Sequence, residues 1–101
     1  MGCEGLILRW TRPALADVVE AQSYIALDNP NAAATIAQRI WDAANKLCDS
    51  PNIGRPGKFS GTREWVVTHT PYLIVYRVKE DAVEILRVWH SRRDWQNNPT
   101  G

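Results

Sequence analysis

Residues 61–93 contain three runs rich in β-branched and aromatic side chains: GTREWVV (61–67), PYLIVYRV (71–78) and VEILRVWHSRR (83–93). Turn-type residues separate each run from the next, and an arginine recurs inside all three. Such runs predict three consecutive antiparallel strands. Because charged side chains interrupt the strand interiors, we expect one face of this sheet to be presented to an acidic partner.

A two-residue turn at Glu80-Asp81 would set the register of the last two strands, pairing Arg77 with Glu84. One face of this predicted hairpin then serves as the core surface for the helices and carries Leu73, Val75, Leu86 and Val88. The other face mixes rings with arginine, which suits stacking or a protein partner, and carries Tyr72, Ile74, Tyr76, Ile85, Arg87 and Trp89. A shift of one residue would exchange the two faces.

The first half of the chain predicts one strand and two helices. The apolar run Leu6–Trp10 is typical of a strand, and Thr11 is a candidate helix cap. Apolar residues then recur at helical spacing as far as Ile25, and the break at 28–31 leaves Asn31 as the predicted cap of a second helix. A short connection favours an antiparallel helix hairpin. The glycine- and proline-rich segment Pro51–Gly61 is predicted to be a loop.

The predicted fold class is therefore α+β: an N-terminal strand, an antiparallel helix hairpin, then a three-stranded antiparallel sheet. A length of 101 residues favours a single domain over 1–101. The two cysteines, Cys3 and Cys48, have neither a disulfide framework nor a metal-ligand spacing, and no run approaches the length of a membrane span. We expect a cytoplasmic protein with no membrane partner.

Charge is distributed unevenly along the chain. Residues 1–54 carry a net charge of −2 and residues 55–101 a net charge of +3. The basic excess lies on the predicted sheet and the segment that follows it, a modest electrostatic footprint compared with that of a dedicated DNA-binding protein. A solvated face with incidental charge is the alternative interpretation.

Five segments in order resemble the RelE/ParE superfamily of toxins from type II toxin–antitoxin systems. They are DNPNAA (28–33), SPNIGRPG (50–57), GTRE (61–64), PYLIVYRV (71–78) and ILRVWHSRR (85–93). The resemblance covers nearly the whole chain, from Leu8 to Trp95, and implies the RelE/ParE-like fold. It leaves the activity open, because members of this fold use two mechanisms.

The RelE-like mechanism is metal-independent cleavage of messenger RNA on the ribosome. For this activity the resemblance implies Arg63, His90, Arg92 and Arg93 as catalytic candidates. The sequence departs from that branch where Leu73 replaces an arginine after the third-strand tyrosine. The basic stretch before it is reduced to Arg55 and Lys58, and the C-terminal catalytic tyrosine is missing, since Trp95 cannot take or give a proton.

The ParE-like mechanism is inhibition of DNA gyrase through protein contacts, and the PYLIVYR segment resembles this branch more closely. It requires a surface rather than a proton shuttle, so no catalytic residue, metal or cofactor is expected. The target-binding candidates are Arg63, Tyr76, Arg87, Trp89, Arg92, Arg93 and Trp95. A plain binding module that only holds an antitoxin is a third possibility.

The resemblance also implies a hetero-oligomer with a cognate antitoxin, whose C-terminal segment would wrap the helix hairpin and the sheet and fold on binding. We expect an apolar groove for this segment, lined in part by Val19, Ile36 or Ile40.

Overall fold

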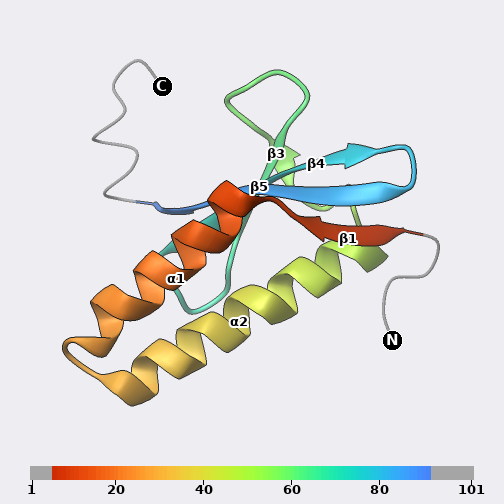
Figure 1. The fold of residues 1–101 in the computed structure, drawn as a ribbon. Coiled ribbons are helices and arrows are strands. Elements are labelled where there is room, and N and C mark those ends of the chain that lie inside the picture. Colours follow the sequence, from red (N-terminus) through yellow and green to blue (C-terminus); the bar gives the residue numbers. More distant parts are fainter. Residues whose placement is uncertain (1–5, 92–101) are drawn as a thin grey trace.

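The computed structural model describes residues 6–91, which form two helices on one side of a five-stranded sheet (Figure 1). The elements are β1 (Ile7–Trp10), α1 (Arg12–Ala26), α2 (Pro30–Asp49), β2 (Arg55–Pro56), β3 (Arg63–Val66), β4 (Tyr72–Lys79) and β5 (Ala82–His90). The α+β class and the helix hairpin are confirmed. No helix in the described range is both long and apolar enough to span a membrane.

The two helices begin at side-chain caps. Thr11 caps α1 as predicted, since its hydroxyl accepts a hydrogen bond from the backbone N–H of Ala14 at 3.4 Å. The cap of α2 is Asn29, whose side chain accepts from the Ala32 N–H at 3.1 Å, so the prediction of Asn31 is wrong. Pro30 explains the difference: its fixed φ suits the first helical position, which makes the preceding residue the cap.

The sheet has the strand order β1-β5-β4-β3-β2. The three predicted strands correspond to β3, β4 and β5, which pair antiparallel. Two strands join them: β1 runs parallel to β5, and the short β2 pairs with β3 inside the segment that the sequence predicts to be a loop. The two residues of β2, Arg55 and Pro56, pair with Glu64 and Arg63, although one of them is a proline and glycines flank them.

The pairing of β4 with β5 corrects the predicted faces. Arg77 pairs with Glu84 as predicted, but a β-bulge then shifts the register so that Val75 faces Arg87 rather than Leu86. The helices pack on the face that the sequence assigns to a partner. Sheet residues in the core cluster with the helices include Tyr72, Ile74, Tyr76, Val83, Ile85 and Val88.

The core lies between this face and the buried stripes of the helices, which contribute Ala14, Val18, Ala21, Ile40, Ala44 and Leu47. Leu73 and Val75 point to the opposite face and are also buried, at 1% and 3% exposure. Cross-strand pairing places Leu73 beside Trp89. The face away from the helices therefore has a buried centre at Leu73 and Val75, while residues such as Val66 and Arg77 on it are exposed.

Candidate binding surfaces

A cluster of two rings and a guanidinium occupies the face away from the helices. The Phe59 and Trp89 rings lie 6.3 Å apart, at 70° to each other. The guanidinium carbon of Arg87 lies 5.5 Å from the centre of the Trp89 ring. We call these three residues the ring surface. Phe59 is 46% exposed and the Arg87 side chain 44%, so the surface is open to a macromolecular partner.

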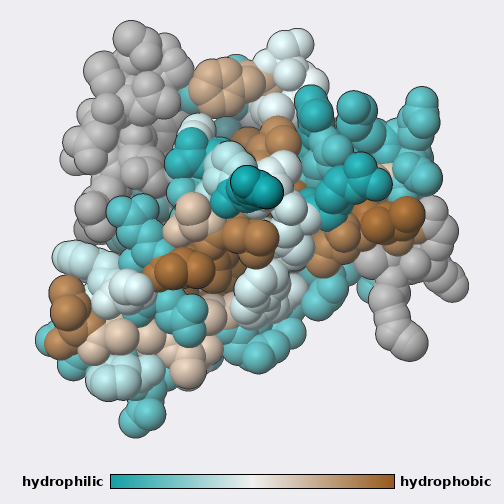
Figure 2. Space-filling view, in the orientation of Figure 1, coloured by the Kyte–Doolittle hydropathy of each residue, from teal (hydrophilic) through white to brown (hydrophobic). Residues whose placement is uncertain are grey.

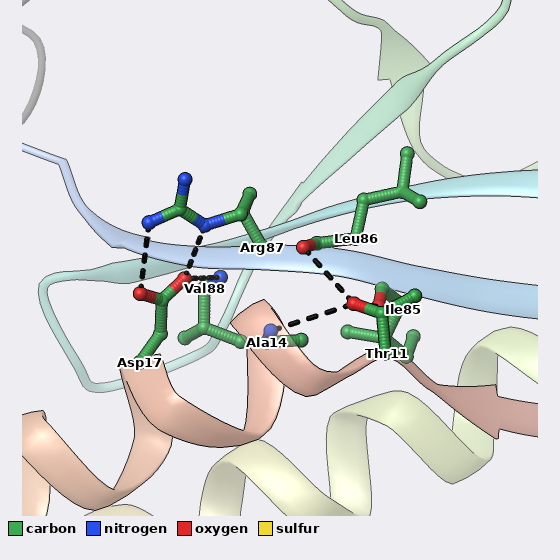
Figure 3. Close-up of polar contacts among 7 residues, drawn as sticks. All are labelled: Thr11, Ala14, Asp17, Ile85, Leu86, Arg87 and Val88. Atoms are coloured by element: carbon green, nitrogen blue, oxygen red, sulfur yellow. Dashed lines mark hydrogen bonds and ion pairs between the residues drawn. The ribbon is translucent and has the colours of Figure 1, made fainter.

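Arg87 is held in place by α1 (Figure 3). Its Nε donates to Asp17 Oδ2 at 2.7 Å and its Nη2 to Asp17 Oδ1 at 3.0 Å, and the backbone N–H of Val88 donates to the same carboxylate at 2.9 Å. Nearby, the Thr11 hydroxyl donates to the carbonyl of Ile85 at 2.8 Å. Bidentate pairing fixes the direction of a guanidinium. The charge of Arg87 is thus balanced within the chain, while its flat face remains against Trp89.

Arg63 and Tyr76, two predicted target-binding residues, hold the loop before β2. The Tyr76 hydroxyl donates to the Pro51 carbonyl at 2.8 Å and accepts from the Gly54 N–H at 3.0 Å. Arg63 Nη1 donates to the Gly54 carbonyl at 2.7 Å. Burial raises the pKa of the Tyr76 phenol, and the Gly54 hydrogen bond and the Arg63 charge oppose this shift. Tyr76 has no exposed surface, so its predicted contact with a target is corrected.

The nuclease candidates within the described range lie apart. Arg63 pairs with Tyr76, and His90 pairs with Tyr72, four residues along β4. At ~3.3 Å per residue this separates the two backbones by about 13 Å along the strand. The His90 ring instead lies edge-on to Tyr72, with centres 5.3 Å apart. The other two nuclease candidates, Arg92 and Arg93, lie outside the described residues, as does the predicted target-binding residue Trp95.

Metal ligands are not grouped in the described range either. Residues 6–91 contain no cluster of three or more His, Cys, Asp or Glu side chains able to hold an ion.

The three predicted antitoxin-binding residues lie in different environments. Val19 is 62% exposed on α1, Ile36 lines a groove of about 560 Å³ beside α2, and Ile40 is 1% exposed within the core. The prediction that Ile40 contacts the antitoxin is therefore corrected, because the helix hairpin itself buries this side chain. Val19 and Leu15 are exposed apolar residues on α1, and Leu27 is another directly after its end; Figure 2 shows hydrophobic surface over this helix.

Two residues of these surfaces escape the sequence reasoning. Phe59 is a single aromatic residue in a glycine-rich loop, where no periodicity marks its direction. Asp17 lies between Ala14 and Ala21 on the buried stripe of α1, with its side chain 11% exposed. A carboxylate on an apolar stripe indicates a paired cation, which is the signal that could have found it.

The chain is similar to known toxins in sequence. The family model described as "ParE toxin of type II toxin-antitoxin system, parDE" matches residues 8–95. The protein Y4kP of Sinorhizobium fredii is 44% identical over 88 residues, covering 87% of this chain and 91% of its own length. Toxin RelE2 of Caulobacter vibrioides is 37% identical over 84 residues, covering 83% and 93% of the two chains.

Two solved structures share the fold. A chain of the chromosomal ParDE toxin–antitoxin system from P. aeruginosa superposes with a TM-score of 0.78 at 29% identity, covering 85% of this chain and 96% of that one. A chain of the toxin–antitoxin complex RelBE2 from Mycobacterium tuberculosis gives a TM-score of 0.57 at 23% identity, with coverages of 86% and 99%.

Proposed function

Since this chain belongs to the ParE toxin family of type II toxin–antitoxin systems, we propose that it inhibits DNA gyrase and is neutralised by a cognate antitoxin. It would act in the cytoplasm, where gyrase and its DNA are found. The inhibition would come from protein contacts and would require no reaction at the toxin itself.

Leu73 is the observation that carries this proposal. It stands where the nuclease branch of the superfamily has an arginine, and it is 1% exposed, packed into the sheet. A buried leucine can neither hold a phosphate nor stabilise charge in a transition state. The distance between Arg63 and His90 along β4 supports the same choice, as does the ParDE neighbour with the higher TM-score.

The ring surface is the proposed contact with gyrase. Aromatic and arginine side chains dominate the energetics of protein interfaces because they bury large areas at a small entropy loss. Phe59, Arg87 and Trp89 provide this combination on the face that the helices leave open. The pairing of Arg87 with Asp17 limits the motion of the guanidinium before binding, which reduces the ordering cost.

The antitoxin is proposed to cover the exposed apolar side of α1 around Leu15 and Val19. An amphipathic segment that folds on binding would bury this surface and repay its ordering entropy there. The resulting complex would be a hetero-oligomer of toxin and antitoxin.

The test incubates the toxin with gyrase, ATP and supercoiled plasmid, and measures the linear DNA released after detergent and protease. Phe59→Ala should require about ten times more toxin for the same linear DNA, as expected for the loss of one interface anchor. Leu27→Ala is the matched control, because Leu27 is an exposed apolar residue at the tip of the helix hairpin. Absence of linear DNA with excess wild-type toxin would refute gyrase as the target.

Messenger RNA cleavage on the ribosome is the second candidate, favoured by the likeness to a relative named RelE2. Its test maps cuts in messenger RNA on translating ribosomes. Cuts that vanish with His90→Gln, in a chain that leaves gyrase unaffected, would establish this activity in place of gyrase inhibition.

A further inference from the structure

Glu64 is the one charged side chain that is buried within residues 6–91, at 4% exposure. It lies on β3 opposite Val75 of β4, and residues that face each other across two antiparallel strands point to the same side of the sheet. Because Val75 points away from the helices, the Glu64 carboxylate does so too, on the side that carries Trp89. A buried carboxylate is costly unless hydrogen bonds replace the lost water, so its partners indicate its role.

Both oxygens of this carboxylate hold the segment before β3. Oε1 accepts from Arg55 Nη2 at 3.3 Å, and Oε2 accepts from the backbone N–H of Lys58 at 3.2 Å. The Arg55 side chain is 61% exposed, so water screens this ion pair and it adds little to stability. The bond to the Lys58 N–H is different, because it fixes a main-chain position directly before Phe59. The carboxylate therefore determines the course of the loop more than the stability of the sheet.

The loop itself is closed by hydrogen bonds on both sides of Phe59, and we call residues 57–62 the Phe59 loop. At its base, the Gly57 N–H donates to the Thr62 carbonyl at 2.8 Å. At its tip, the Phe59 carbonyl accepts from the Thr62 N–H at 3.1 Å and from the Thr62 hydroxyl at 2.6 Å. This is a β-turn, and Gly61 supplies the φ of 80° at its third position. A loop closed in this way has few conformations of its own, so a single contact with the sheet can set its direction.

The Phe59 loop crosses β4 on the side of the sheet away from the helices. Figure 1 shows this segment, in green before β3, on the side opposite α1 and α2. The Lys58 N–H is bound at β3 and the Phe59 ring lies 6.3 Å from that of Trp89 on β5, while β4 lies between these two strands. Leu73 and Val75 of β4 point to the same side and are buried, as expected beneath the loop. Phe59 therefore reaches the ring surface only while the loop lies across the sheet.

We propose that Glu64 is a positioning residue of the ring surface, which holds the Phe59 loop across β4 so that Phe59 stands beside Trp89 before a target binds. This inference rests on the proposed contact with gyrase and deepens it, because it names the group that orders the contact surface. A surface ordered in advance loses less entropy on binding. Two carboxylates then prepare the ring surface: Asp17 orients Arg87, and Glu64 orients Phe59.

Two variants of similar side-chain volume test this role. Glu64→Met removes both acceptor oxygens, and replacing a buried ion pair partner together with its charge by a well-packed apolar group often leaves stability unchanged. Glu64→Gln keeps one acceptor for the Lys58 N–H. In the free toxin, NMR should show NOEs between the Phe59 and Trp89 rings in the wild type and in Glu64→Gln, and their loss in Glu64→Met. Circular dichroism should show that both variants are folded.

The gyrase assay measures the consequence for binding. Glu64→Met should require about 5-fold more toxin than the wild type for half-maximal linear DNA, because the loop must then be ordered on binding, whereas Glu64→Gln should stay within about 2-fold. In the Phe59→Ala background, Glu64→Met should add no more than about 2-fold, because the residue through which it acts is already absent.

Glu84→Met is the matched control. It makes the same substitution at a carboxylate of β5 that is 12% exposed and paired with Arg77, near the β4–β5 turn and away from the Phe59 loop. Its potency in the gyrase assay should equal that of the wild type.

Ring NOEs that persist in Glu64→Met would overturn the proposal. So would an equal loss of potency with and without Phe59, or a loss as large in Glu84→Met. Failure of Glu64→Met to fold would also overturn it, because the carboxylate would then serve stability rather than position. The proposed function fails separately: if the wild type yields no linear DNA, gyrase is not the target, and the NOEs of the free toxin still decide whether Glu64 orders Phe59.

Discussion

The loop before β2 is closed by contacts that leave no room for a side chain at Gly54. A Cβ atom built there would overlap the Tyr76 hydroxyl and would lie 2.8 Å from Tyr76 Cε1 and 2.9 Å from the Glu64 carbonyl oxygen. The Tyr76 ring is fully buried and the Glu64 oxygen belongs to the backbone of β3, so neither can move aside easily. In Gly54→Ala the loop itself must shift.

The magnitude follows from what this shift breaks. Overpacking of a tight site costs about 1–3 kcal/mol. The shift also strains the hydrogen bonds between Gly54 and Tyr76 and between Gly54 and Arg63, each worth about 1 kcal/mol. We expect Gly54→Ala to lower the free energy of unfolding by about 3 kcal/mol. Tyr76→Phe alone should lower it by about 2 kcal/mol, because it leaves the Gly54 N–H and the Pro51 carbonyl without their partner.

The double variant distinguishes this explanation from a general loss of stability. The Tyr76→Phe substitution removes the oxygen that the new Cβ meets first, so the Gly54→Ala/Tyr76→Phe variant should be more stable than additivity predicts, by about 1 kcal/mol or more. The assay is urea unfolding followed by circular dichroism. Gly61→Ala is the control, since Gly61 faces open space and suffers only from its φ of 80°. Additive effects of Gly54→Ala and Tyr76→Phe, within about 0.5 kcal/mol, would refute the steric account.

Two further perturbations test the ion pairs. Asp17→Ala should lower the free energy of unfolding by about 2 kcal/mol, because Val88 loses the acceptor of its N–H, whereas Asp17→Asn should cost about half as much; equal urea midpoints for the two variants would contradict this reasoning. The Arg77 hydrogen bond lowers the pKa of Glu84 below 4.5, so the contribution of this pair to stability is complete above pH 4.5 and is lost as the pH falls through the lowered pKa. An NMR titration of the Glu84 carboxyl should show its pKa rise in Arg77→Gln, and an unchanged titration would contradict the assignment.

The fold class could be predicted because its determinants are local. Thr11 marks the start of α1, the break at 28–31 separates the two helices, and the β-branched runs around Val75 and Ile85 mark strands. The face of the sheet that packs the helices could not be predicted in this way. The polar hydroxyls of Tyr72 and Tyr76 suggest that these residues lie on the surface. The Tyr76 hydroxyl instead forms hydrogen bonds with the backbone of the loop before β2, so the ring can be buried in the core.

The binding surfaces could be predicted less well from the sequence, because contacts between residues far apart in the chain determine their geometry. The pairing of Asp17 with Arg87 joins residues 70 positions apart, and the β-bulge shifts the β4–β5 register beside it. No local pattern contains this information. Arg87 and Trp89 were predicted as target-binding residues, but the β-bulge rather than simple alternation separates them from Tyr76 and Ile85, whereas Phe59 reaches Trp89 from a loop without periodicity.

β5 is longer than the neighbour that borders it. β1 pairs with β5 only from Ala82 to Ile85. Beyond Ile85, the edge of β5 could expose main-chain hydrogen-bonding groups to another polypeptide. The Thr11 hydroxyl donates to the Ile85 carbonyl, and the Asp17 carboxylate accepts from the Val88 N–H. These bonds interrupt the exposed edge of β5 where pairing with a strand of another chain would begin. A natural or engineered binder that approaches along this border therefore meets main-chain groups that are already hydrogen-bonded, which makes side-chain contacts more important for its affinity. The same interruption disfavours pairing of the β5 edges of two toxin molecules.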